Sequence, residues 1–253
     1  MQGLYEGIDP SMNKIKSLIL FLVLLVSPGI SSALTLSDLR TQTRDLALDN
    51  GSRLRFSTVT VDTFINEGQR IAVSKTKAII KGSQFELTVG ATYYSLPSDY
   101  WQMRRLSLRN QDLEQESQDS LSSKVGLTWA ESSGLPNSYF ISFASRTKVG
   151  FYPFPNNSSS TGSVRYEYYA QATDLSATSD EPFAAINELE PFHHILAYYA
   201  AYKLCMIDGR QDLGVLYRTE FYEGLEQLKN EALARPSYRP SAMPINRTNR
   251  AGP

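Results

Sequence analysis

The sequence predicts an α+β protein in which helix pairs from both ends of the chain form one bundle around a β-rich, antiparallel middle segment. Apolar residues recur at helical spacing in residues 35–73 and in residues 190–233, and neither segment can bury its apolar stripe alone. Between them the apolar period changes to two, which is typical of strands. With 253 residues, 42% hydrophobic and 20% charged, the chain is long enough to bury a sizeable core.

Residues 1–33 have the layout of a secretory signal peptide. Lys14 and Lys16 precede the apolar run LILFLVLLV, and the small-residue site Ser31-x-Ala33 follows it. The run is short for a bilayer span, so a transmembrane anchor is the weaker interpretation. The leader therefore indicates export, unless the chain starts further downstream.

Residues 34–82 are predicted to form the first helix pair. Thr35 and Asp38 have the spacing of a capping box, and Asn50-Gly51 is the expected stop of the first helix. Thr60 is expected to cap the second helix, TVDTFINEGQRIAV. The short connector, residues 53–56, makes the two helices neighbours. Their apolar stripes consist of Leu36, Leu39, Leu46, Val61, Phe64, Ile65, Ile71 and Ala72.

Residues 83–176 are predicted to be the β-rich segment. Apolar residues alternate on both sides of the pair Gly90-Ala91, which indicates a β-hairpin. Further strands are expected at residues 139–145, 148–152 and 163–169, the last two separated by the polar loop PNNSSSTGS. The alternating residues of the hairpin are Phe85, Leu87, Val89, Tyr94 and Leu96.

The stretch YYSLPSDYWQMRRLSL contains a corner within this segment. Pro97 ends one strand because it lacks the N–H that a β-ladder needs. Asp99 is expected to bond back to the local backbone. A second strand is expected after the aromatic pair Tyr100 and Trp101.

Residues 177–235 are predicted to form a helical hairpin that packs with residues 34–82. Pro191 suits the first turn of its first helix, and Gly209 suits the C-terminal cap. The second helix covers residues 210–233. Apolar residues at helical spacing are Phe192, Ile195, Tyr199, Tyr202 and Met206 in the first helix, and Leu213, Tyr217, Leu225 and Leu228 in the second.

The last segment, residues 236–253, has no apolar periodicity. It is rich in proline, and together with the preceding residue it carries four arginines and no acidic residue. Such a segment cannot offset its ordering cost alone, so we expect it to be disordered in the isolated protein. It can become ordered against a partner that supplies acidic groups and a groove.

Composition argues against several classes of protein. The formal net charge of −1 provides no basic field to concentrate phosphate backbones, so nucleic-acid binding as the main function has no electrostatic basis. The single cysteine, Cys205, has no second cysteine in the chain for a disulfide. Its apolar neighbours predict a buried, inert thiol.

The sequence predicts no catalytic, cofactor-binding or metal site, and hence no enzyme. His193 and His194 are the only histidines, and adjacent helical positions point about 100° apart, so they cannot line one site together. We favour a partly buried or interface histidine. Glu188 and Glu190 are interpreted as first-turn charges that suit the helix dipole.

Tyrosines gather in two segments of the chain. They are compatible with a sugar-binding platform, but we favour a core or a subunit interface. These residues are Tyr166, Tyr168, Tyr169, Tyr198 and Tyr199.

The order of these segments resembles one known family, the head-to-tail adaptor proteins of tailed bacteriophages, which lie beneath the portal. The resemblance covers nearly all of residues 34–233. Each matching piece is a common packing or turn signal, so their order and spacing carry the resemblance. In chain order the pieces are TLSDLR, FINEGQRIA, YSLPSDY, GLPNSYFIS, FYPFP, RYEYYAQATDLS and PFHHILAYYAAYKL.

The resemblance implies a structural, non-enzymatic virion protein that is assembled in the host cytoplasm. Its expected partners are the portal protein, a tail or stopper protein, and further copies of the chain in a ring that is commonly dodecameric. Double-stranded DNA is expected to pass through the ring without specific contact, and no cofactor or small-molecule substrate is implied. The expected portal-docking residues are Arg235, Arg239, Arg247 and Arg250.

The leader departs from this family, because phage heads and tails assemble in the cytoplasm. One solution is that Leu34 is encoded by TTG and is the true start, since such adaptors often open with Met-Thr-Leu and Leu34-Thr35-Leu36 occupies that place. The alternative function is an exported bacterial β-rich binding protein of unknown ligand. A secreted hydrolase is a weaker third option, because no catalytic set can be assembled.

Overall fold

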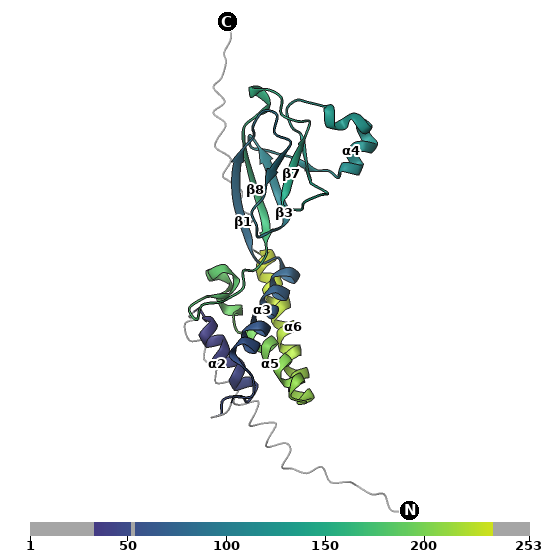
Figure 1. The fold of residues 1–253 in the computed structure, drawn as a ribbon. Coiled ribbons are helices and arrows are strands. Elements are labelled where there is room, and N and C mark those ends of the chain that lie inside the picture. The colour runs from purple at the N-terminus through teal and green to yellow at the C-terminus, as the bar shows by residue number, and fades with distance from the viewer. Residues whose placement is uncertain (1–32, 52–53, 235–253) are drawn as a thin grey trace, which may run out of the picture.

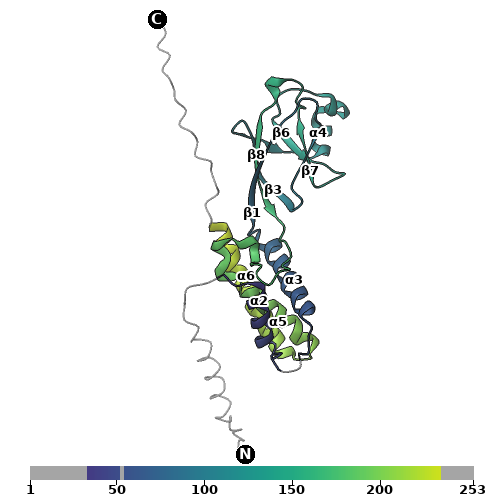
Figure 2. The ribbon, with the colours of Figure 1, turned by 60° about the vertical axis from the view of Figure 1, so that its left-hand side comes forward.

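The computed structural model describes residues 33–51 and 54–234, which form an elongated molecule with two parts (Figure 1). Helices from both ends of the chain make the helical part, and strands from its middle make the β part. Figure 2 shows the two parts end to end. The predicted α+β class, with a bundle made from N- and C-terminal helix pairs, is confirmed.

Among the described residues, four helices form the bundle. The helix α5 packs against each of the other three, and α6 also contacts α3. This central place suits the sequence of α5, ILAYYAAYKLCMI, which is apolar on nearly every side. The four helices are α2 (Leu36–Leu46), α3 (Thr58–Thr76), α5 (Ile195–Ile207) and α6 (Gln211–Ala234).

The helix ends follow local side-chain chemistry. Thr35 and Asp38 form the predicted capping box at the start of α2. The helix α3 begins earlier than predicted, because Ser57 and not Thr60 is its N-cap: the Ser57 hydroxyl accepts a hydrogen bond from the Thr60 N–H at 3.1 Å. Gly209, with φ of 76°, follows the end of α5 as predicted.

Two glycines let the helices approach closely. A Cβ atom on Gly224 of α6 would lie 2.5 Å from Cγ2 of Ile195, and one on Gly68 of α3 would lie 3.0 Å from the ring of Tyr199. Ile195 and Tyr199 are both buried residues of α5. α5 can therefore pack this closely because Gly68 and Gly224, the residues that face it, have no side chain.

Buried amide side chains of α3 hold the chain where it returns from the β part. Asn66 accepts from the Leu175 N–H at 2.7 Å and donates to the Leu175 carbonyl at 3.0 Å. Gln69 donates to the Thr173 carbonyl and accepts from the Phe183 N–H, both at 2.8 Å. These side chains supply the partners that an irregular buried backbone needs.

Two four-stranded sheets form the β part, with strand orders β1-β8-β3-β4 and β2-β7-β6-β5. The pairing of β5 with β6 is parallel and the other strand pairs are antiparallel, so the segment predicted to be antiparallel contains one mixed sheet. The strands are β1 (Ile80–Glu86), β2 (Tyr93–Ser95), β3 (Tyr100–Leu108), β4 (Gln111–Asp112), β5 (Glu114–Gln115), β6 (Ser138–Ile141), β7 (Lys148–Tyr152) and β8 (Ser163–Ala170).

Aromatic rings fill the space between the sheets. Phe85 of β1 stacks on Tyr94 of β2 with their centroids 4.9 Å apart. Both rings also meet Phe151 of β7 edge-on, at 6.1 and 5.6 Å. Tyr166 of β8 lies 5.7 Å from Phe85. The core of the β part therefore contains a network of rings beside its buried leucines and valines.

The hairpin predicted around Gly90-Ala91 is wrong. The strand β1 pairs with β8, and β2 pairs with β7, so the chain crosses from one sheet to the other at this turn. Gly90 adopts φ of 79°, which suits the reversal. The alternating apolar residues on its two sides reflect burial between the sheets rather than pairing with each other.

The Leu-Pro-x-Asp corner is present, and β3 begins at Tyr100. Asp99 bonds to its own backbone N–H, as predicted, and its carboxylate also accepts from Lys81 Nζ at 2.7 Å and from the Tyr168 hydroxyl at 3.0 Å. Burial acts to raise the pKa of Asp99, but these bonds outweigh it and hold the pKa below its usual value. Because β1 and β8 bring these donors to the corner, Asp99 ties β1 to β8.

Several short elements were not predicted, because they carry little apolar periodicity. The helix α4 (Gln118–Val125) buries only Leu121. It is followed by η1 (Leu127–Glu131), and later in the chain come η2 (Ser158–Ser160), η3 (Pro182–Ala185) and η4 (Asn187–Phe192).

Two predictions for the C-terminal helical hairpin need correction. Pro191 does not open α5 but lies inside the 3₁₀ segment η4, where its lack of an N–H is tolerated. Met206, predicted on the apolar face of α5, is exposed near the end of that helix. Phe221, which the spacing missed, is fully buried in α6 against Tyr199.

Candidate docking surfaces

The described residues offer no set of histidine, cysteine and carboxylate side chains that could hold a metal ion. Cys205 is buried in α5, and burial raises the pKa of its thiol, which confirms the predicted buried cysteine. Tyr166, Tyr168 and Tyr199 are also buried, so these tyrosines fill cores and form no open sugar platform. Between residues 33 and 234, leaving out 52 and 53, no helix is long and apolar enough to cross a membrane.

His193 is fully buried, in agreement with the favoured interpretation. Its Nδ1 lies 3.2 Å from both the backbone nitrogen and the backbone oxygen of Leu34. Burial lowers the pKa of His193 to about 4, so the ring is neutral near pH 7. His194 is exposed, and the two rings do not line one site. His193 therefore fastens the start of the helical part to α5.

The end of the helical part farthest from the sheets is called the bundle tip, formed by residues 47–51, 54–56 and 206–210 (Figure 1). Leu48 is 63% exposed, and its φ of 50° is costly for a leucine. Leu54, Met206 and Ile207 are exposed as well. An apolar group of this kind on the surface marks a contact surface.

Ion pairs brace the bundle tip. Arg55 pairs with Asp208, which also lies 2.7 Å from the guanidinium of Arg210. Arg44 pairs at 2.7 Å with Asp49, a carboxylate that is almost fully buried. These pairs join the loop after α2 to the turn between α5 and α6, so the exposed apolar side chains stand on a fixed frame.

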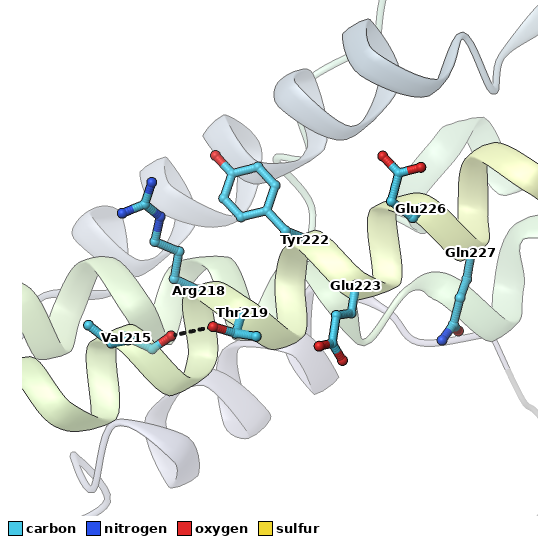
Figure 3. Close-up of a pocket in the computed structure, with 7 residues that line it drawn as sticks. All are labelled: Val215, Arg218, Thr219, Tyr222, Glu223, Glu226 and Gln227. Carbon is cyan, nitrogen blue, oxygen red and sulfur yellow. Dashed lines mark hydrogen bonds between the residues drawn. The ribbon is translucent and has the colours of Figure 1, made fainter.

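The outward face of α6 is a second candidate surface (Figure 3). Val215, Thr219, Tyr222 and Glu226 follow one another along this face at helical spacing, and all four are exposed. They line a shallow groove of about 660 Å³. The guanidinium of Arg218 lies 5.8 Å from the centre of the Tyr222 ring. We call this the α6 groove.

The β part carries two strongly exposed apolar residues. Phe143, in the turn between β6 and β7, is 97% exposed, and Leu127 of η1 is 91% exposed. Trp129, close to Leu127 in sequence, packs against Phe140 and Phe154 with centroid distances of 5.2 and 6.1 Å. The packing of Trp129 holds η1 in place, so Leu127 is presented on a fixed element.

The arginines predicted to dock on the portal lie outside the described residues, as does the leader-like segment, residues 1–32. The last described residue, Ala234, ends α6 where the helical part meets the β part (Figure 1). The unplaced arginines are Arg235, Arg239, Arg247 and Arg250.

A known protein family matches most of the chain. Residues 34–247 match the family model described as SU10 adaptor protein. This range begins at Leu34 and takes in nearly all of the described structure. No curated protein matches the chain.

Proposed function

The chain belongs to the SU10 adaptor protein family, and from this premise we propose that its copies form a ring beneath the portal of a tailed bacteriophage. A phage adaptor is a structural component of the virion that interacts with portal and tail components. In the proposed ring the copies extend the DNA channel and offer a surface to the tail. Double-stranded DNA passes through without specific contact, and the chain catalyses no reaction.

The observation that best supports this role is the separation of exposed apolar side chains between the two parts of the molecule. Leu48 and Ile207 lie at the bundle tip, whereas Phe143 and Leu127 lie in the β part. A subunit that joins portal to tail needs contact surfaces in separate places, each with apolar residues at its centre. A ring, expected to be dodecameric, repeats each surface many times.

The tail sequence supports a portal contact. Guanidinium groups form paired hydrogen bonds with carboxylates, so four arginines with no acid among them suit an acidic partner. A ring adds avidity to a contact that is weak in a single copy. We therefore assign portal docking to Arg235, Arg239, Arg247 and Arg250.

The working protein is proposed to start at or near Leu34. The family match begins there, and the Leu34 backbone already meets His193. Mass spectrometry of purified virions is expected to find no peptide from residues 12–32, and finding such peptides in assembled particles overturns the proposal. Only the leader-like residues favour the alternative function, an exported binding protein.

The portal contact is tested by deleting residues 236–253 and mixing the product with purified portal rings across a salt series. The full chain is expected to dock with an affinity that falls as salt rises, and the deletion to lose at least about tenfold. Replacing Arg239 and Arg247 with lysine keeps the charge, so an intermediate loss is expected. Unchanged docking of the deletion shows that the tail is not the portal anchor, while the adaptor role stands.

A further inference from the structure

The exposed side of α6 has an excess of negative charge. Five carboxylates and two basic groups are exposed around the helix, which gives its exposed side chains together a net charge of −3. The four tail arginines have the opposite sign, with no acid among them. The exposed charged residues of α6 are Asp212, Arg218, Glu220, Glu223, Glu226, Lys229 and Glu231.

The α6 groove also has the shape and lining that an extended, proline-rich chain needs. Arg218, Tyr222 and Glu226 point to one side of the helix, whereas Thr219 and Glu223 point to the other (Figure 3). A strip of helix surface is left between the two rows. Proline-rich segments bind grooves that present an aromatic ring, because the polyproline conformation loses little entropy on binding. Tyr222, which is 47% exposed, supplies that ring.

The tail is long enough to run along the whole of α6. The tail, residues 235–253, follows directly on Ala234, the last residue of α6. At about 1.5 Å per residue the 24 residues of α6 extend over roughly 36 Å. Polyproline geometry gives the 19 tail residues roughly 59 Å at about 3.1 Å per residue. A tail that reverses after Ala234 can therefore run along the whole helix.

The charges come into register in this arrangement. With a turn that uses two residues after Ala234, Arg239 lies roughly 9 Å back along the helix, between the levels of Glu226 and Glu231. Arg247, after a turn that uses two residues, lies roughly 34 Å back, level with Asp212 near the start of α6. Basic and acidic groups therefore meet at two separate points.

We propose that the α6 groove binds the arginine- and proline-rich tail of the same chain in the free protein. The short tether gives the tail a high effective concentration at its own helix, so weak individual contacts are sufficient. The tail predicted to be disordered alone thus has an acidic partner and a groove within its own chain. A partner with more carboxylates displaces it, which keeps the tail available for docking. This inference rests on α6 and the tail, not on the ring or the portal contact.

Paramagnetic NMR of the full chain tests the proposal. A spin label is attached to the tail through Ser241→Cys, while Cys205 is buried and stays unlabelled. Broadening is expected for the backbone amides of residues 215–227 when label and ¹⁵N are in the same molecule. A mixture of ¹⁵N chains without label and labelled chains without ¹⁵N is expected to show none.

Charge reversal provides the matched control. Glu223→Lys with Glu226→Lys is expected to lower the bound population about tenfold, because two exposed contacts become repulsive. Glu86→Lys with Glu131→Lys changes the net charge equally at exposed positions in the β part, away from α6, and broadening is expected to persist. The proposal is overturned if α6 shows no broadening, if both double variants lose it equally, or if it occurs in the mixed sample, which indicates a second copy.

Discussion

The helical part and the β part have interiors of different chemistry. At the centre of the bundle, α5 buries alanines and branched aliphatic side chains, and its neighbours place glycines against it. The interior of the β part combines leucine and valine side chains with a network of phenylalanine and tyrosine rings. The bundle therefore depends on how closely backbones approach, whereas the β part depends on where rings are held.

The two parts share a narrow joint. The Ala170 N–H of β8 donates to the Ile79 carbonyl at 3.0 Å, just after α3 ends. Lys77, at the end of α3, places its Nζ 5.0 Å from the centre of the Tyr169 ring and 5.9 Å from that of Trp101. Because bonds and ring contacts of both parts meet here, and their buried residues form one continuous cluster, we expect a firm joint.

The largest expected effect is in the bundle. Ile195 is fully buried, so Ile195→Asp puts an unpaired charge in the core and should lower the free energy of unfolding by about 5 kcal/mol. Leu213→Asp, at a partly buried position, should cost less. Urea unfolding followed by circular dichroism measures both, with exposed Val215→Asp as the control. If Ile195→Asp unfolds like the parent, the bundle assignment is wrong.

The second prediction is that the stability of the bundle depends on pH through His193. His193 has a pKa of about 4 in the folded state against an ordinary value of 6.5, so the unfolded chain binds more protons between these values. Stability is therefore full above pH 6.5 and falls as pH drops to about 4, by up to roughly 3 kcal/mol at about 1.4 kcal/mol per pKa unit.

Urea titrations at several pH values check this slope. His193→Gln should remove most of this slope. His194 is exposed, but the groups around its ring partly desolvate it and lower its pKa, so it should leave a smaller slope. An unchanged slope in His193→Gln contradicts the burial argument.

Replacing one buried glycine in each part with alanine allows the stability of the two regions to be compared. A Cβ on Gly150 of β7 would lie 2.4 Å from the ring of Phe140, the residue opposite it on β6, and one on Gly224 would meet Ile195. Gly150→Ala and Gly224→Ala should each cost about 1–3 kcal/mol by overpacking. Gly51→Ala, with no atom within 4 Å of its Cβ, is the control.

Tryptophan fluorescence distinguishes the effect of Gly150→Ala from that of Gly224→Ala. Displacement of Phe140 should change the fluorescence of Trp129, which packs on that ring, in Gly150→Ala only. Adding Ile195→Ala to Gly224→Ala should recover part of the loss relative to the sum of the single changes. Equal fluorescence changes in both glycine variants mean that the disturbance at Gly224 is transmitted to Trp129, and that the effects of the two glycines are not local.

Substitutions at the exposed apolar residues are expected to change stability least. They are also expected to affect binding most specifically. Phe143→Ser and Ile207→Ser replace exposed side chains, so each should change stability by less than about 0.5 kcal/mol. Because they lie in different parts of the molecule, each should weaken binding to only one of two purified components, portal rings or tails. If either variant loses binding to both portal rings and tails, the two surfaces do not act separately.

Local chemistry predicted much of the helical part. The capping box of Thr35 and Asp38, the glycine after α5 and the buried Cys205 and His193 each depend on neighbours close in sequence or on one helix face. Strand pairing could not be predicted from local chemistry, because Gly90 fits a hairpin turn as well as a crossing between sheets. Which of the two forms depends on strands that are distant in sequence.

The candidate surfaces were harder to predict than the core. Spacing indicated Leu225 and Leu228 on the buried side of α6, but the exposure of Tyr222 depends on which helices cover α6. Leu48 and Ile207 look like core residues in the sequence, and only the packing of the bundle tip shows that they are exposed. The excess of arginine in the tail was visible from composition alone.

Electron microscopy of the purified chain mixed with portal rings of the same phage tests the adaptor role most directly. The account predicts a second ring of many copies, coaxial with the portal and with an open channel, in which the helical part and the β part of each copy are resolved. Portal rings that remain bare while the chain stays monomeric, at concentrations where it is folded, contradict the account.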